Sequence, residues 1–175
     1  EFRRVLFRSL TNLTFNEKFN QDVSSLPKGI THLIFRNKFN QDISKLPHNI
    51  THLTFNCCSE KKYIIPSSVK YLTLYCNNQY IIDSLPNSIV ELKLDYDFNS
   101  MMDNLPTSIK KLIICTESDY NNNLNCLPNF IEELELNYAY DKRILNIPSN
   151  LKKLICHKNY PYINDFVMCE IETYE

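Results

Sequence analysis

The chain of 175 residues carries a formal net charge of −1 and has a pI near 6.5, values typical of one globular domain with a sizeable core. Basic and acidic residues are interspersed, so the charge pattern indicates no binding to nucleic acid or to an anionic membrane. No apolar run approaches the roughly 20 residues of a membrane span. The single glycine excludes glycine-rich phosphate-binding loops.

The first nine residues, EFRRVLFRS, are basic and differ from everything that follows. They resemble the conceptual translation of a sequencing adapter. A basic arm and the start of a targeting peptide are the alternatives, but no apolar region or small-residue cleavage site follows. We expect residues 1–9 to be an artefact and the natural protein to begin further upstream.

From residue 10 the chain follows a repeat of about 20 residues. Residues 19–35 read FNQDVSSLPKGITHLIF, and residues 39–55 read FNQDISKLPHNITHLTF. A unit that recurs in this way is a structural module. The period continues through seven prolines: Pro27, Pro47, Pro66, Pro86, Pro106, Pro128 and Pro148.

Apolar positions keep their place around each proline. In the first unit they are Leu26 before Pro27, and Ile30, Leu33 and Phe35 after it. The positions after the proline predict a short strand with one buried face, whereas the Leu-Pro step argues against a helix. About twelve residues remain between strands, too few for a long crossover helix. We therefore predict that residues 10–157 form a β-rich solenoid of about eight parallel coils, with short strands on one face and irregular proline-containing segments on the other.

At one position of most repeats an aromatic residue is followed by a polar one, as Asn20 follows Phe19. We call the equivalent residues of successive repeats a column. Exposed turn asparagines are one explanation. Because an aromatic residue precedes most of them, we expect instead a buried ladder of amides that bridges neighbouring coils. The column consists of Asn20, Asn40, Ser59, Gln79, Asn99, Asn121 and Asp141.

The recurring LPxxIxxLxL/F pattern and the segments FNQDV and FNQDI resemble the FNIP repeat family, whose repeats are similar to leucine-rich repeats. The resemblance covers roughly Leu10 to His157. Asp22 and Asp42 stand where the family name has a proline, and later units replace FNQ by FNS, YNN or YDK. The resemblance implies a leucine-rich-repeat-like solenoid that binds partners and does not catalyse a reaction. Such proteins occur in amoebae and giant viruses, sometimes joined to F-box or kinase domains.

Beyond Pro148 the repeat fades, although the last coil of a solenoid needs a cover. Val167, Cys169 and Ile171 alternate, so we expect residues 158–175 to form an irregular cap with a strand around these positions. A disordered tail is the alternative.

Outward-facing strand positions predict the functional surface, because successive side chains alternate between the two faces. In the middle of the array these positions are aromatic and largely uncharged, and tyrosine is enriched at interface hot spots. Tyrosines that merely fill a β surface are the alternative. The predicted partner-binding residues are His32, Arg36, His52, Thr54, Tyr71, Thr73, Tyr75 and Lys93.

Outward charges alternate in sign from Glu91 through Lys111 and Glu133 to Lys153. We interpret them as cross-strand pairs that fix the register, although a site for a charged partner is an alternative.

The histidines and cysteines do not suggest a metal site or a catalytic Cys–His pair. His32 and His52 should be strand neighbours, with Cys57 and Cys58 just beyond, but two imidazoles make a poor zinc site. A Cys–His pair elsewhere on the face would be two coils apart, about 10 Å by strand spacing. We expect no catalytic residues, no cofactor and no metal.

The seven cysteines lack the paired spacings of a disulfide framework. We interpret most of them as small buried side chains in a reducing compartment, and we expect the protein to be cytoplasmic.

The predicted function is a protein–protein interaction scaffold that acts as a monomer on a protein partner. Two alternatives belong to other classes. A hydrolase or metal-dependent enzyme on a β-solenoid would show a carboxylate cluster on one face. A secreted adhesin would show paired cysteines.

Overall fold

The structure is a computed structural model that describes residues 10–36, 39–56 and 61–175. The proposed adapter remnant at residues 1–9 lies outside the described residues, as do Cys57, Cys58 and Ser59.

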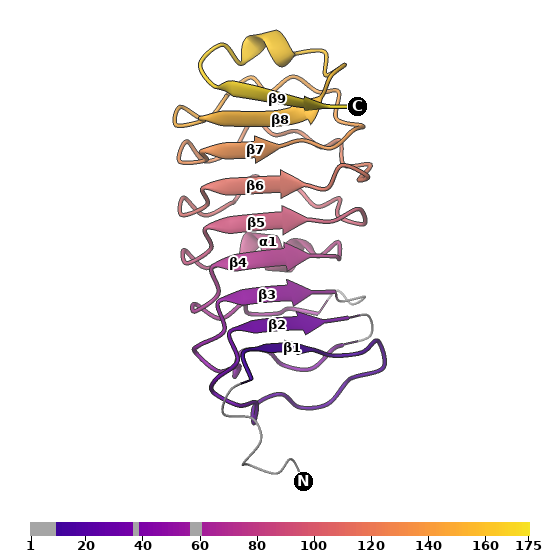
Figure 1. Cartoon of the computed structure of the whole chain (residues 1–175), viewed down its shortest axis with the longest axis vertical. Coiled ribbons are helices and arrows are strands. Elements are labelled where there is room, and N and C mark those ends of the chain that lie inside the picture. Colours follow the sequence, from indigo (N-terminus) through magenta and orange to yellow (C-terminus); the bar gives the residue numbers. More distant parts are fainter. Residues whose placement is uncertain (1–9, 37–38, 57–60) are drawn as a thin grey trace.

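Nine short strands lie side by side in chain order and form one parallel sheet along the length of the molecule (Figure 1). The register holds throughout: Leu33 lies opposite Leu53, and Leu92 lies opposite Leu112. The sheet confirms the predicted solenoid, a stack of parallel coils with little helix. The strands are β1 (Asn12–Thr14), β2 (His32–Phe35), β3 (His52–Phe55), β4 (Tyr71–Leu74), β5 (Glu91–Leu94), β6 (Lys111–Ile114), β7 (Glu133–Glu135), β8 (Lys153–His157) and β9 (Glu170–Tyr174).

Burial alternates along the inner strands as the sequence pattern predicts. In β5, Leu92 and Leu94 are fully buried, whereas Glu91 and Lys93 are partly exposed on the other face. The same alternation holds from β2 to β8. One face of the sheet therefore covers the core, and the other faces outward.

The Leu-Pro step closes a turn in every unit. The backbone N–H of Ile30 donates to the carbonyl of Pro27 at 3.2 Å, and the corresponding bond recurs in all seven proline-containing units. Proline pre-sets φ for this bend, and the bond satisfies an N–H that would otherwise be buried without a partner. The chain then enters the strand with its apolar side chains directed inward.

Two departures from the repeat are accommodated within single coils. Lys62 is exposed where other units have an apolar residue, and the neighbouring Tyr63 is buried instead, with its ring edge-on to Phe55 at 4.7 Å. Asn78 occupies the aromatic position of its unit. Its side chain accepts the N–H of Ile81 and caps α1 (Gln79–Asp83) at the N-terminus.

The polar column is not the buried ladder that the sequence suggested. Asn20, Asn40 and Asn99 are exposed, although the rings of Phe39 and Phe98 beside the last two are buried. The amides nevertheless bridge coils. Asn20 Oδ1 accepts the backbone N–H of Asn40 at 3.0 Å, and Asn121 Nδ2 donates to Asp141 Oδ1 at 2.8 Å.

The expected terminal strand lies further along the chain than the sequence indicated. Val167 is 80% exposed and precedes the strand, which begins at Glu170 and pairs in regular register with β8 over five residues. The alternating pattern was misleading here because Val167 and Cys169 belong to the bend that enters β9. A short 3-10 helix, η1 (Ile163–Asp165), lies in the same final segment.

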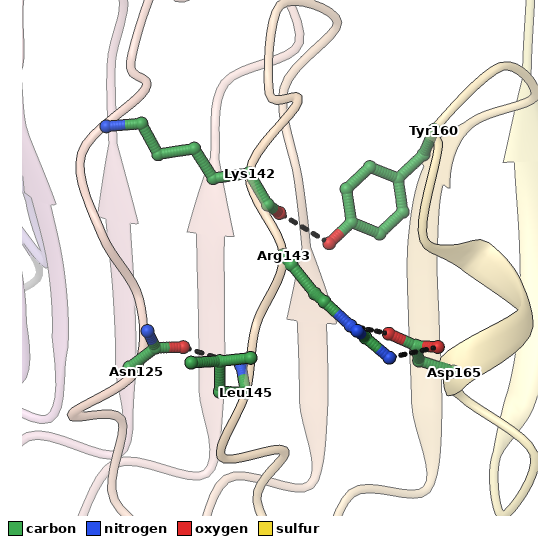
Figure 2. A network of polar contacts seen from close by, with 6 residues as sticks. All are labelled: Asn125, Lys142, Arg143, Leu145, Tyr160 and Asp165. Atoms are coloured by element: carbon green, nitrogen blue, oxygen red, sulfur yellow. Dashed lines mark hydrogen bonds and ion pairs between the residues drawn. The ribbon is translucent and has the colours of Figure 1, made fainter.

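Polar contacts tie this final segment to the coils before it (Figure 2). The guanidinium of Arg143 donates to both carboxylate oxygens of Asp165, at 2.7 and 3.3 Å. The Tyr160 hydroxyl donates to the carbonyl of Lys142 at 2.9 Å. An ion pair and a side chain–backbone hydrogen bond thus fix the final segment to the preceding coil.

Candidate functional site

Three rings stack across neighbouring strands on the outward face of the sheet. The centroids of His32 and His52 are 3.9 Å apart, and those of His52 and Tyr71 are 4.2 Å apart, with the ring planes within 15° of parallel. The stack follows directly from the fold, because the register places these three residues opposite one another on β2, β3 and β4. Tyr71 is 39% exposed, and the two imidazoles are partly exposed.

Threonine hydroxyls orient both imidazoles. Thr31 Oγ1 lies 2.9 Å from His32 Nδ1, and Thr51 Oγ1 lies 2.9 Å from His52 Nδ1. Partial burial, and then the neighbouring His32, lower the pKa of His52, whereas Glu91 acts in the opposite direction. The stack therefore favours a neutral His52.

A second set of outward side chains, two residues further along each strand than the stacked rings, continues the surface. Thr54 lies opposite Thr73, and Thr73 lies opposite Lys93. All three side chains are partly exposed. Together with the stack, these residues form a surface in which Thr54 and Thr73 are uncharged and Lys93, on β5, is basic.

The third row, beyond the strand ends, contains a group that sequence reasoning missed. Asp95 is only 7% exposed, and its carboxylate lies close enough to Tyr75 to affect the pKa of that side chain. Burial and this carboxylate raise the pKa of Tyr75, while Arg36 has a smaller, opposite effect. Tyr75 and Asp95 occupy equivalent positions one repeat apart. The repeat pattern alone could therefore have predicted that the two residues lie side by side.

All eight predicted residues thus lie on or at the end of neighbouring strands β2 to β5. The stack joins His32, His52 and Tyr71 directly. Arg36 stands apart: it is exposed at the end of β2 and lies two strands from Tyr75.

The remaining strands present charges that neutralise one another. Lys111 pairs with Glu133 at 2.7 Å, as the sequence pattern suggested, and this carboxylate raises the pKa of Lys111. Lys153 pairs with Glu172 on β9 at 2.6 Å, although its register neighbour on β7 is Glu133. The outward face is therefore divided into an aromatic half on β2–β4 and an ion-paired half on β6–β9.

The geometry of the histidine pair is unsuited to chelation. Because the imidazole planes are nearly parallel, the outer ring nitrogens point in the same direction and do not converge on one ion. Within the described ranges, no group of three or more His, Cys, Asp or Glu side chains is placed to hold a metal.

A shallow depression of about 570 Å³ lies where β6 and β7 end, and sequence reasoning did not anticipate it. The interval from Pro106 to Pro128 is 22 residues, and the two additional residues fall in the bend after β6 that forms one wall. The lining residues are Thr116, Glu117, Ser118, Asp119, Tyr138, Ala139, Tyr174 and Glu175.

No helix in the described part of the chain has the length and apolar character needed to cross a bilayer.

Comparisons with known proteins agree with the geometry. A family model described as FNIP Repeat matches residues 22–58, 61–97, 77–117 and 120–159, which together make up more than half of the chain. A comparison with curated proteins gave no match.

One solved structure is similar over most of the chain. It is CroV588, a giant-virus protein described as a novel circular LRR protein structure, with 25% sequence identity and a TM-score of 0.58. The match covers 84% of this chain and 27% of CroV588, so the chain spans about a quarter of that protein's length.

Proposed function

Because the chain belongs to the FNIP repeat family, we propose that it is a protein-interaction scaffold whose partner binds the aromatic half of the outward strand face and the adjacent Lys93 on β5. The repeat solenoid is typical of binding scaffolds and generally non-catalytic. The proposed site consists of His32, Arg36, His52, Thr54, Tyr71, Thr73, Tyr75 and Lys93.

The continuous stack of His32, His52 and Tyr71 is the observation that carries this proposal. It presents aromatic edges and polar ring atoms on a rigid sheet, and side chains that are already held in place lose little conformational entropy on binding. The ion-paired half is a poorer binding site, because a partner would have to displace contacts such as Lys111–Glu133.

The partner is a protein, and the scaffold itself acts as a monomer without catalytic residues or a cofactor. Free thiols at Cys115, Cys126, Cys156 and Cys169 support a cytoplasmic location. The open outward face has the width of a protein segment and is too flat to enclose a small molecule.

A pull-down from eukaryotic cell extract tests the proposal with Tyr71→Ala/Tyr75→Ala as the variant. We expect a captured protein to lose at least tenfold in apparent affinity, because large aromatic side chains dominate such interfaces. Lys111→Ala/Glu133→Ala, in the ion-paired half, is the matched control and should retain binding. Equal capture by the tyrosine variant and the wild type would exclude this surface as the site.

A further inference from the structure

The threonines beside His32 and His52 determine which nitrogen of each imidazole carries the proton. A hydroxyl has one proton to donate. Thr31 Oγ1 donates to the carbonyl of Thr11 at 3.3 Å, and Thr51 Oγ1 donates to the carbonyl of Thr31 at 3.5 Å. Each Oγ1 also lies 2.9 Å from Nδ1 of the following histidine, so in these contacts Nδ1 is the donor. Because a neutral imidazole has only one N–H, Nε2 is an acceptor on both rings.

The two Nε2 atoms form a matched pair of acceptors on neighbouring strands. The ring centroids are 3.9 Å apart, and the ring planes are 15° from parallel. Each ring is held through Nδ1 by an equivalent threonine, so the two Nε2 lone pairs point in the same direction. Both imidazoles are partly exposed on the outward face, and a partner can therefore reach both acceptors.

An arginine guanidinium is the protein group that matches this pair. Its N–H groups form a rigid, planar fork of parallel donors. Such a fork reaches two parallel acceptors 3.9 Å apart with only a small tilt of each N–H bond. A lysine ammonium would have to lie between the two lone pairs, away from the direction of either, and an ionised carboxylate has no proton to donate.

The side chains around the pair are compatible with a cation. In the same outward row, Asn12 on β1 lies opposite His32, and Tyr71 on β4 lies opposite His52. The first charged residue of this row is Glu91 on β5. Its carboxylate forms no ion pair with any other described residue, so its charge attracts a cation toward the row.

The two cations of the proposed site lie further from the histidine pair along the strands. Arg36 is four residues beyond His32, roughly 13 Å at the rise of an extended strand. Lys93 is on the same strand as Glu91 but two residues further from the row of stacked rings. Neither cation therefore adjoins the two Nε2 atoms.

Resting on the proposed function, we propose that the partner contributes an arginine whose guanidinium donates one N–H to Nε2 of His32 and another to Nε2 of His52. The arginine and a proton compete for the same lone pairs, so a fall in pH releases the partner. Thr31 and Thr51 are positioning residues, because their hydroxyls hold the tautomer that leaves Nε2 free to accept.

Long-range ¹H–¹⁵N NMR spectra of the full chain test the proposal. At pH 7.5, Nε2 should be the unprotonated nitrogen of both rings. N-acetyl-arginine methylamide, used as the probe, should shift both Nε2 signals in a saturable way. The corresponding lysine and glutamate compounds should bind at least threefold more weakly. The apparent affinity of the arginine compound should fall at least threefold at pH 5, because protonated rings offer no lone pair.

The variant Thr51→Val tests the positioning role. Valine keeps the β-branched shape but lacks the hydroxyl, so the Nε2–H tautomer of His52 should become more populated and the arginine compound should bind at least twofold more weakly. Thr14→Val, at an exposed position of β1 outside the proposed site, is the matched control and should change neither signal.

An Nε2–H tautomer on either histidine, or equal shifts with the arginine and lysine compounds, would overturn the inference. If Tyr71→Ala/Tyr75→Ala still lost its partner in the pull-down, the proposed function would stand and only the arginine would be excluded. Self-association of the wild type that Arg36→Gln abolishes would overturn the inference as well, because a second copy of the chain would then supply the arginine.

Discussion

Partial burial, and the second histidine stacked on it, make His52 harder to protonate. Partial burial and His32 lower the pKa of His52 below its ordinary value of 6.5. The unfolded chain therefore takes up a proton at His52 more readily than the folded chain does. It follows that folding stability decreases as the pH falls from about 6.5 through the lower pKa of the folded state.

We expect the free energy of unfolding of the wild type to fall more between pH 8 and pH 5 than that of His52→Gln. The difference should stay below about 1 kcal/mol, because both rings are partly exposed to solvent. Urea denaturation at the two pH values measures it. His48→Gln, at an exposed position outside the stack, is the control. A pH dependence that is unchanged in His52→Gln would contradict the prediction.

A buried tyrosine hydroxyl offers a second prediction at this scale. The Tyr120 side chain is 1% exposed, and its hydroxyl has no hydrogen-bond partner among the described residues. The equivalent residue of the neighbouring coil is Phe98, whose ring stacks on Tyr120 at 5.8 Å. Tyr120→Phe should therefore stabilise the protein by about 1 kcal/mol, because it removes an unsatisfied polar group.

Tyr160→Phe is the matched control, since the Tyr160 hydroxyl donates to Lys142. It should destabilise by about 1 kcal/mol. Thermal melts of both variants measure the effects, and a destabilised Tyr120→Phe would show that its hydroxyl has a partner in solution.

At the level of single strands, the face on which a side chain lies determines how much its truncation lowers the free energy of unfolding. Leu112 is fully buried between equivalent leucines, so Leu112→Ala should cost about 2–5 kcal/mol. Ile113→Ala, on the partly exposed outward face of the same strand, should cost less than half as much. Chemical denaturation of the two variants compares them directly, and equal losses would argue against the inward assignment of Leu112.

The strands were predictable from sequence because their apolar positions recur around a proline with a fixed local role. The bends were not. Asn20 and Asn40 face outward because the direction of a side chain in a bend depends on local φ and ψ, which a column of similar residues does not reveal. Likewise, the start of β9 depends on pairing with β8, and the alternation of Val167, Cys169 and Ile171 carries no such information.

The stack of histidines and tyrosine could be predicted as neighbouring residues, since the register follows from the period. Its ring geometry could not, because the threonines that orient the imidazoles lie outside the outward columns. Asp95 was visible as a column member but not as a buried partner of Tyr75.

The whole molecule is held together by contacts between successive coils, because each strand contacts only its neighbours in the sheet. A deletion of residues 87–106 removes one complete period and joins two equivalent turns. We expect this shortened chain to melt cooperatively at a lower temperature, as circular dichroism would show.

A deletion of residues 87–96, half a period, is the control. It should abolish the cooperative transition, because it removes β5 but keeps the bend that follows it, so β4 and β6 are joined by a connection half a period too long to form one coil. Loss of the transition in both chains would mean that the coils are not interchangeable units.

The parallel arrangement of the strands also determines how the molecule responds to a pulling force along its long axis. Tension on the two ends acts on one coil boundary at a time, since the boundaries are loaded in series. Each coil that detaches releases about 20 residues, or roughly 70 Å of extended chain. Optical-tweezer traces should therefore show a staircase of evenly sized steps, so that the molecule yields gradually where a globular domain would rupture in a single event.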